Sequence, residues 1–119
     1  MKRIIDAFFN SMRAFRRLAG SEAAFRQELI LLALAVPVGW FVSLTWRGYA
    51  LLIGVLLLLI LVEVLNTGIE ATCDAVSRDF SPDIELAKDC GSLAVLIAVI
   101  IAAGAWGIAL TERLIDLLF

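Results

Sequence analysis

Three carboxylates and an amide follow directly on the most apolar run of the chain. Residues 56–62 are all hydrophobic, and Glu63, Asn66, Glu70 and Asp74 come next. On a helix these polar positions share one stripe, because side chains three and four residues apart lie on the same face. Carboxylates one and two turns apart can hold Mg²⁺, which prefers hard oxygen ligands and shares its coordination with phosphates. The spacing therefore indicates a site for a metal and a phosphate group at the end of a hydrophobic helix.

The simpler alternative for this stripe is a helix end that is exposed to water. Charged groups inside a membrane are costly, and acidic residues there generally face a functional site or a water-filled cavity. Because Glu63 follows seven apolar residues without a break, the pattern favours a site.

A second polar segment follows at residues 81–92, with the sequence SPDIELAKDCGS. Ser81 and Pro82 are typical of a helix start. Lys88 and Asp89 then lie where this helix enters its own apolar run. A lysine in such a place can pair with a phosphate or extend to the membrane surface. The chain contains no glycine-rich phosphate-binding motif, which excludes the common soluble nucleotide-binding folds.

The composition requires a membrane around these segments. Of 119 residues, 62% are hydrophobic, and the mean hydropathy is +0.98. A soluble domain of this size needs more polar surface, so we expect one membrane-embedded domain, residues 1–119. Uncharged runs of 18, 15 and 22 residues begin at positions 29, 48 and 90. About 20 apolar residues cross a bilayer as a helix. We predict an all-α protein with transmembrane helices at about 27–46, 48–77 and 82–113.

The first 19 residues predict a helix of a different kind. Apolar residues recur at three- and four-residue steps, and basic residues occupy much of the remainder. This pattern is typical of an amphipathic helix lying on the membrane surface, with a simple anchor as the alternative for most of its residues. Six of the ten lysines and arginines precede the first span, and two lie between the second and third. The positive-inside rule therefore predicts that the N-terminus and the polar stripe face the cytoplasm.

Aromatic and small residues indicate how the spans are placed and packed. Four aromatic side chains suit the membrane–water interface: Trp40, Trp46, Tyr49 and Trp106. Small residues that recur every four positions allow helices to approach closely in lipid, either between chains or within one chain. In the third span these are Ala94, Ala98 and Ala102.

Taken together, the polar segments point to a protein family more specifically than either segment does alone. The sequences EVLNTGIEATCD and AKDCGSLAVLIAVI, preceded by EAAFRQE at residues 22–28, closely resemble the prokaryotic diacylglycerol kinase family of small integral membrane lipid kinases. The resemblance covers nearly the whole chain. It implies a surface helix followed by three transmembrane helices, a homotrimer in the bacterial inner membrane, and Mg²⁺ acting with ATP as co-substrate.

The resemblance also implies roles for individual residues. Glu63 is expected to be the catalytic base, and Glu22 and Glu70 the ligands of the metal that accompanies ATP. The positions that match ATP contacts are Arg3, Glu22, Asn66, Glu70, Asp79, Lys88 and Asp89. The positions that match contacts with the lipid substrate are Arg3, Ala24, Phe25, Arg26, Gln27, Glu28, Glu63 and Ser92.

The expected function is the ATP-dependent phosphorylation of diacylglycerol to phosphatidic acid at the cytoplasmic membrane interface. ATP is water-soluble and the acceptor hydroxyl belongs to a lipid, so the two substrates meet at the interface. Phosphoryl transfer then needs mainly in-line positioning and neutralised phosphate charge. The nearer alternative is the same reaction on a polyprenol such as undecaprenol, as in relatives from Gram-positive bacteria. The other is a non-enzymatic membrane subunit or an ion pathway. No nucleic-acid partner is expected.

Overall fold

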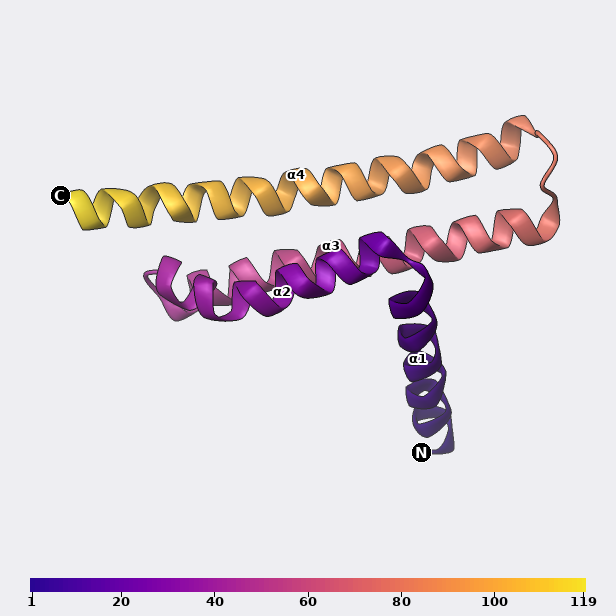
Figure 1. The fold of residues 1–119 in the computed structure, drawn as a ribbon, viewed down its shortest axis with the longest axis horizontal. Coiled ribbons are helices and arrows are strands. Elements are labelled where there is room, and N and C mark those ends of the chain that lie inside the picture. The colour runs from indigo at the N-terminus through magenta and orange to yellow at the C-terminus, as the bar shows by residue number, and fades with distance from the viewer.

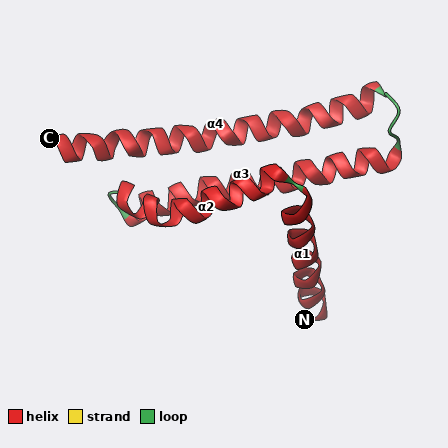
Figure 2. Ribbon diagram, in the orientation of Figure 1, coloured by secondary structure: helices red, strands yellow, loops and turns green.

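The structure, a computed structural model, describes residues 1–119 as four helices with short connections. Figure 1 and Figure 2 show their arrangement. The helices are α1 (Lys2–Ser21), α2 (Ala23–Val42), α3 (Trp46–Val76) and α4 (Pro82–Leu118). Three of them, α2, α3 and α4, are long and apolar enough to cross a membrane. The predicted all-α architecture with three candidate spans is therefore confirmed.

The central helix of the bundle is α3. It packs against both α2 and α4, which barely meet each other, and it runs antiparallel to both (Figure 1). The side chains of Ala35, Val55, Leu56 and Ala102 form a small buried cluster between the three helices. Most other large apolar side chains of the spans are exposed in the single chain. Such surfaces are stable against lipid, whose tails are as apolar as leucine.

Small side chains bring α4 against α3. Ala98 and Ala102 are only 3% and 6% exposed, whereas Ala94 is exposed. The alanine repeat therefore packs, for two of its three members, within one chain. Near them, Trp106 inserts between the helices, and its Nε1 donates a hydrogen bond of 3.1 Å to the Leu52 carbonyl. An indole N–H needs an acceptor once it leaves water, so this bond aligns α4 with α3.

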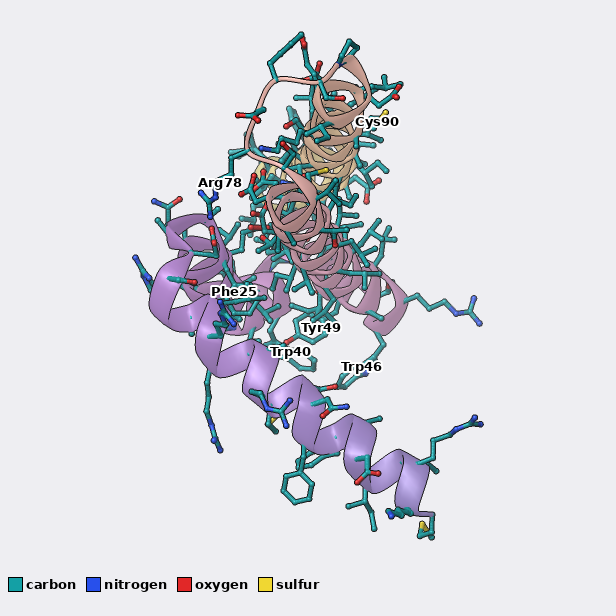
Figure 3. The ribbon with its side chains drawn as sticks, turned by 90° about the vertical axis from the view of Figure 1, so that its right-hand side faces the viewer. Phe25, Trp40, Trp46, Tyr49, Arg78 and Cys90 are labelled. Carbon is teal, nitrogen blue, oxygen red and sulfur yellow. The ribbon has the colours of Figure 1, made fainter.

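Aromatic rings gather at the turn between α2 and α3 (Figure 3). The Trp40 ring centroid lies 4.6 Å from that of Trp46 and 5.5 Å from that of Tyr49. The Tyr49 hydroxyl donates to the Val36 carbonyl over 2.9 Å. Thr45 caps the N-terminus of α3, since its Oγ1 accepts a hydrogen bond of 3.0 Å from the Gly48 backbone N–H in the first turn. Rings with an apolar body and a polar edge suit this end of the bundle, where the chain leaves the hydrocarbon.

The surface helix α1 runs crosswise to the bundle and buries none of its residues (Figure 1). It joins α2 through Glu22, which has an extended backbone. Phe25 is 2% exposed, and its ring lies edge-on to that of Phe15 with centroids 5.5 Å apart. Arg26 donates from Nη1 to the Ala19 carbonyl over 3.0 Å. These contacts hold α1 across the base of α2, which is the direction that a helix on a membrane surface requires.

Candidate active site

The polar stripe of α3 is partly buried where α3 meets its neighbours. Glu63 and Asn66 are 8% and 9% exposed, and Glu70 is half-buried. Leu59, one turn before Glu63, is also buried. Glu63 is therefore the acidic group of α3 nearest to the apolar core. Burial to this degree does not fit the alternative of a helix end that is exposed to water.

The amide of Asn66 is held between Glu70 and the backbone of α4. Its Nδ2 donates to the Glu70 Oε1 over 3.3 Å, while its Oδ1 is buried without a hydrogen-bond partner. The facing residue on α4 is Gly91, which is buried and adds no side chain to the contact. A fixed donor of this kind sets the direction of the carboxylate that it contacts.

Four carboxylates from the α1–α2 junction, α2 and α3 share this region. The charge of Glu63 interacts with those of Glu70 and Glu22, and the charge of Glu28 interacts with that of Glu63. Glu28 Oε1 is buried and has no hydrogen-bond partner. Glu63 is buried and the other three are half-buried, and like charges that are partly removed from water are unfavourable unless a cation or a polar ligand balances them. The arrangement is therefore suited to receiving positive charge.

The donor set fits a divalent cation that arrives with a phosphate ligand. No group of three or more acidic, cysteine or histidine side chains is arranged to hold a metal ion unaided. Mg²⁺, however, commonly takes only one or two carboxylates and completes its shell with water and substrate phosphates. Glu70, which is held by Asn66, and Glu22, at the junction of α1 and α2, are the two candidates for such carboxylates.

A polar hollow lies next to the stripe, at the turn from α3 to α4. It has a volume of about 400 Å³. Three predicted ATP contacts meet around it, although they are spread over eleven residues of sequence: Asp79, Lys88 and Asp89. The other lining residues were not predicted: Ser77, Arg78, Phe80, Ser81, Ile84 and Glu85. The turn contributes Arg78, and a basic residue directly before the predicted Asp79 was the available signal for it.

Lys88 is tied to α3 by an ion pair with Asp74. The Lys88 Nζ lies 2.9 Å from the Asp74 Oδ1, and its charge also interacts with that of Glu70. The polar stripe includes Asp74, but Asp74 was not among the predicted site residues. Its partnership depends on how α4 aligns with α3, which no spacing within α3 reveals.

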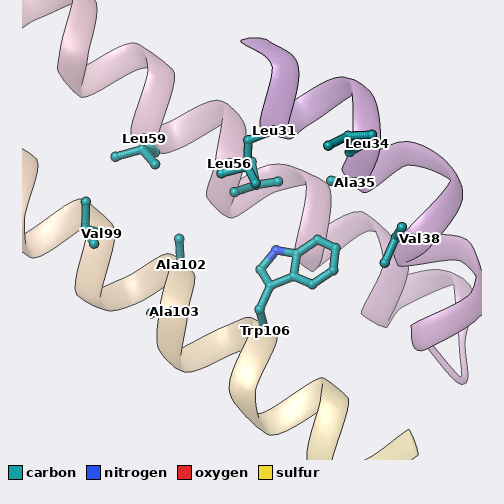
Figure 4. A pocket seen from close by; sticks show the side chains of 10 residues that line it. All are labelled: Leu31, Leu34, Ala35, Val38, Leu56, Leu59, Val99, Ala102, Ala103 and Trp106. Atoms are coloured by element: carbon teal, nitrogen blue, oxygen red, sulfur yellow. The ribbon is translucent and has the colours of Figure 1, made fainter. Parts of the chain in front are cut away.

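A second cavity of about 400 Å³ is entirely apolar (Figure 4). It is lined by α2, α3 and α4 and lies on the membrane side of Glu63, since Leu56 and Leu59 form part of its wall. With no polar group to receive a phosphate, this cavity is unsuited to a nucleotide.

The remaining predicted contacts do not lie together in the single chain. Arg3 lies in the first turn of α1, at the end that points away from the bundle (Figure 1). Phe25 and Arg26 are engaged with α1, as described above. Three other predicted contacts with the lipid substrate are exposed on their helices: Ala24, Gln27 and Ser92.

Fold and site together define a multi-pass helical membrane protein with a cluster of acidic side chains at one end of its spans. The family model for prokaryotic diacylglycerol kinase matches residues 9–110. The chain belongs to the prokaryotic diacylglycerol kinase family.

Named relatives agree with this assignment. The diacylglycerol kinase of Pseudomonas aeruginosa is 39% identical over 106 residues, which cover 89% of this chain and 86% of the relative. That of Escherichia coli K12 is 40% identical over 108 residues, covering 91% and 88%. That of Helicobacter pylori J99 is 32% identical over 106 residues, covering 89% and 83%. The predicted family and enzyme class are confirmed, and the alternatives of a non-enzymatic subunit or an ion pathway are excluded.

Proposed function

We propose that this enzyme transfers the γ-phosphoryl group of ATP to the hydroxyl of diacylglycerol, giving phosphatidic acid, at the cytoplasmic face of a bacterial inner membrane. The observation that carries the proposal is the burial of Glu63 between the apolar core and the hydrogen-bonded pair of Asn66 and Glu70. This position suits a base that meets a lipid hydroxyl on one side and nucleotide phosphates on the other. The names of the relatives support diacylglycerol over a polyprenol as acceptor.

In the proposed reaction the acceptor oxygen forms a bond to the γ-phosphorus. The bond from that phosphorus to the β–γ bridging oxygen breaks, and ADP leaves. The hydroxyl proton passes to Glu63, the first carboxylate that a head group reaches from the hydrocarbon side. A general base must lie within hydrogen-bond reach of this proton. Glu28, whose Oε1 has no partner in the chain, is suited to accept a hydrogen bond from the lipid head group.

The nucleotide is proposed to occupy the polar hollow, with its phosphates directed toward Lys88 and Glu70. Lys88 supplies positive charge there. Ionised Asp79 and Asp89 are acceptors only, so they suit the ribose hydroxyls or the adenine amino group better than phosphate. Glu22 and Glu70 would hold Mg²⁺, which supplies further neutralisation of the phosphate charge when it is bound. Asn66 keeps Glu70 oriented through their hydrogen bond.

We further propose that the working form is a homotrimer whose sites use residues of two chains. One chain leaves Arg3, in the first turn of α1, away from the other expected contacts. A neighbouring chain would bring this arginine to the site. The proposal also keeps the other expected contacts with the lipid substrate, which are Ala24, Phe25, Arg26, Gln27 and Ser92.

The test is direct transfer of labelled phosphate. The purified protein in detergent micelles is supplied with ATP labelled at the γ-position and with either diacylglycerol or undecaprenol. We expect labelled phosphatidic acid, dependent on Mg²⁺, and little transfer to undecaprenol. Transfer to undecaprenol alone would replace the acceptor in the proposal. Transfer to neither lipid would overturn it.

A further inference from the structure

We propose that Gly91 is a positioning residue of this site, which keeps the Asn66 amide in the orientation that fixes Glu70. The glycine is buried on α4, opposite Asn66. A Cβ placed on residue 91 would overlap the Asn66 Oδ1, and it would lie 3.2 Å from the Asn66 Cγ and 3.8 Å from its Cα. The space that a side chain would need is already filled by the amide.

This contact is peculiar to one glycine. A Cβ at four other glycines of the spans would meet nothing within 4 Å: Gly54, Gly68, Gly104 and Gly107. At Gly39 the nearest atoms would be 3.3 Å away. Only at residue 91 would a methyl group overlap another atom. At residue 91, therefore, the absence of a side chain leaves the room that the Asn66 amide occupies.

The two sides of the Asn66 amide have opposite surroundings. Nδ2 donates to the Glu70 Oε1 over 3.3 Å, whereas Oδ1 faces α4 and is buried without a donor. Turning the amide over would bring Oδ1 against a carboxylate, placing two acceptors in contact. Glu70 thus selects the orientation of the amide, and the α4 backbone at Gly91 confines it from the other side. A side chain at residue 91 must displace the amide and weaken its hydrogen bond to Glu70.

Displacement of the amide would reach the metal through Glu70, and this step rests on the proposed function. A donor that holds one oxygen of a ligating carboxylate orients the other, and loss of such a partner typically lowers metal affinity about 10–100-fold. Gly91 touches no reacting atom in this scheme. It acts through Asn66, and Asn66 acts through Glu70.

The geometry is tested first without any activity measurement. The chain has only two asparagines, Asn10 and Asn66, so protein labelled with ¹⁵N-asparagine gives two pairs of side-chain amide signals by NMR in micelles. The Asn66 pair is identified by its absence in Asn66→Ala. We expect Gly91→Ala to shift that pair. Gly104→Ala, the same change in open space on the same helix, should leave it in place. An unshifted Asn66 signal in Gly91→Ala would overturn the proposal.

The kinetic arm asks whether the glycine acts through Asn66. We expect Gly91→Ala to raise the Mg²⁺ concentration for half-maximal activity by about tenfold or more, with the KM for diacylglycerol unchanged. In an Asn66→Ala background, Gly91→Ala should add nothing, because the displaced group is absent. If the effects of the two substitutions were fully additive, residue 91 would act through packing alone, and the proposal would be wrong.

Two further outcomes remain decisive. If Gly91→Ala alone does not fold, the double variant Gly91→Ala/Asn66→Ala should recover folded protein. A double variant that stays unfolded would contradict the proposal, since the overlap would then not be with the amide. If even the native chain transfers no phosphate, the proposed function fails, while the NMR comparison still decides the role of Gly91.

Discussion

The Nζ of Lys88 lies 2.9 Å from the Oδ1 of Asp74, and this ion pair joins α4 to α3 beside the polar hollow. The two side chains are 40% and 39% exposed. Ion pairs open to solvent contribute little to stability, because water screens their attraction. The pair therefore matters mainly for where it holds the lysine, at the side of the hollow where the charge of Lys88 also interacts with that of Glu70.

The first prediction concerns this pair. Asp74→Asn keeps the size of the side chain and removes its charge, so Lys88 loses the group that holds it in place. We expect the KM for ATP to rise severalfold, with almost no change in the thermal unfolding midpoint in detergent. The matched control is Asp116→Asn, which breaks the Arg113–Asp116 pair of 3.2 Å at the far end of α4 and should change neither quantity. A loss of stability as large as the loss of ATP use would mean that the pair serves the fold.

The second prediction separates two carboxylates of the stripe. Glu63→Gln should lower kcat by about 10²–10⁴-fold, the usual contribution of a general base, with nearly unchanged apparent affinity for ATP and Mg²⁺. Glu70→Gln should instead weaken metal-dependent nucleotide binding, and added Mg²⁺ should recover part of its activity. Steady-state kinetics across Mg²⁺ concentrations distinguish the two. Equal nucleotide-binding defects in both variants would contradict the assigned roles.

The third prediction concerns the attachment of α1. Removing a buried aromatic ring from a packed core costs about 3–5 kcal/mol, and Phe25 packs against Phe15 of α1. Phe25→Ala should therefore loosen α1 while the spans stay inserted. Limited digestion with trypsin should cut faster at the arginines of α1, which are Arg3, Arg13, Arg16 and Arg17. The control Phe9→Ala, at a side chain 61% exposed, should leave the cleavage rate unchanged. Equal cleavage of the two variants would show that the ring does not hold α1.

The fourth prediction concerns topology. Eight of the ten lysines and arginines lie before residue 27 or between residues 78 and 88, and the other two, Arg47 and Arg113, lie near the opposite ends of the spans. In a chain with Cys73 and Cys90 replaced by serine, a cysteine at Asp79 should be labelled only from the cytoplasmic side. A cysteine at Gly48 should be labelled only from the other side. Labelling of both positions from the same side would contradict the predicted topology, because the span between them, α3, could then not cross the membrane.

The fifth prediction concerns assembly. If sites form between chains of a trimer, two inactive variants can complement each other. Protomers carrying Glu63→Gln and Asp89→Asn, unfolded and reassembled together, should regain measurable kinase activity. Crosslinking must confirm that mixed trimers form. Mixed trimers as inactive as their parents would place both residues in a single-chain site, and a fully active particle of monomer mass would refute the trimer itself.

Much of the fold could be predicted because each helix is dictated locally. Backbone polar groups cannot remain unpaired in lipid, so apolar runs of sufficient length must be helices. The stripe of Glu63, Asn66 and Glu70 follows from the helical period in the same way. Composition alone did not decide which faces pack within the chain. Trp106 suits an interface by type, yet its indole bonds to Leu52 between helices.

The sequence by itself determined that the chain is embedded in a membrane, how many spans it has and which carboxylates share one face of α3. These properties depend on the hydropathy and the helical period of single segments. Only the tertiary structure decided which groups on different helices meet. Asp74 and Lys88 are 14 residues apart in the chain, and Asn66 faces Gly91 across the whole α3–α4 turn. Such contacts depend on the register of α4 against α3. That register is set jointly by the turn, by Ala98 and Ala102 in the packed face, and by the Trp106 hydrogen bond, because a rigid helix brings every facing pair into contact at once or none.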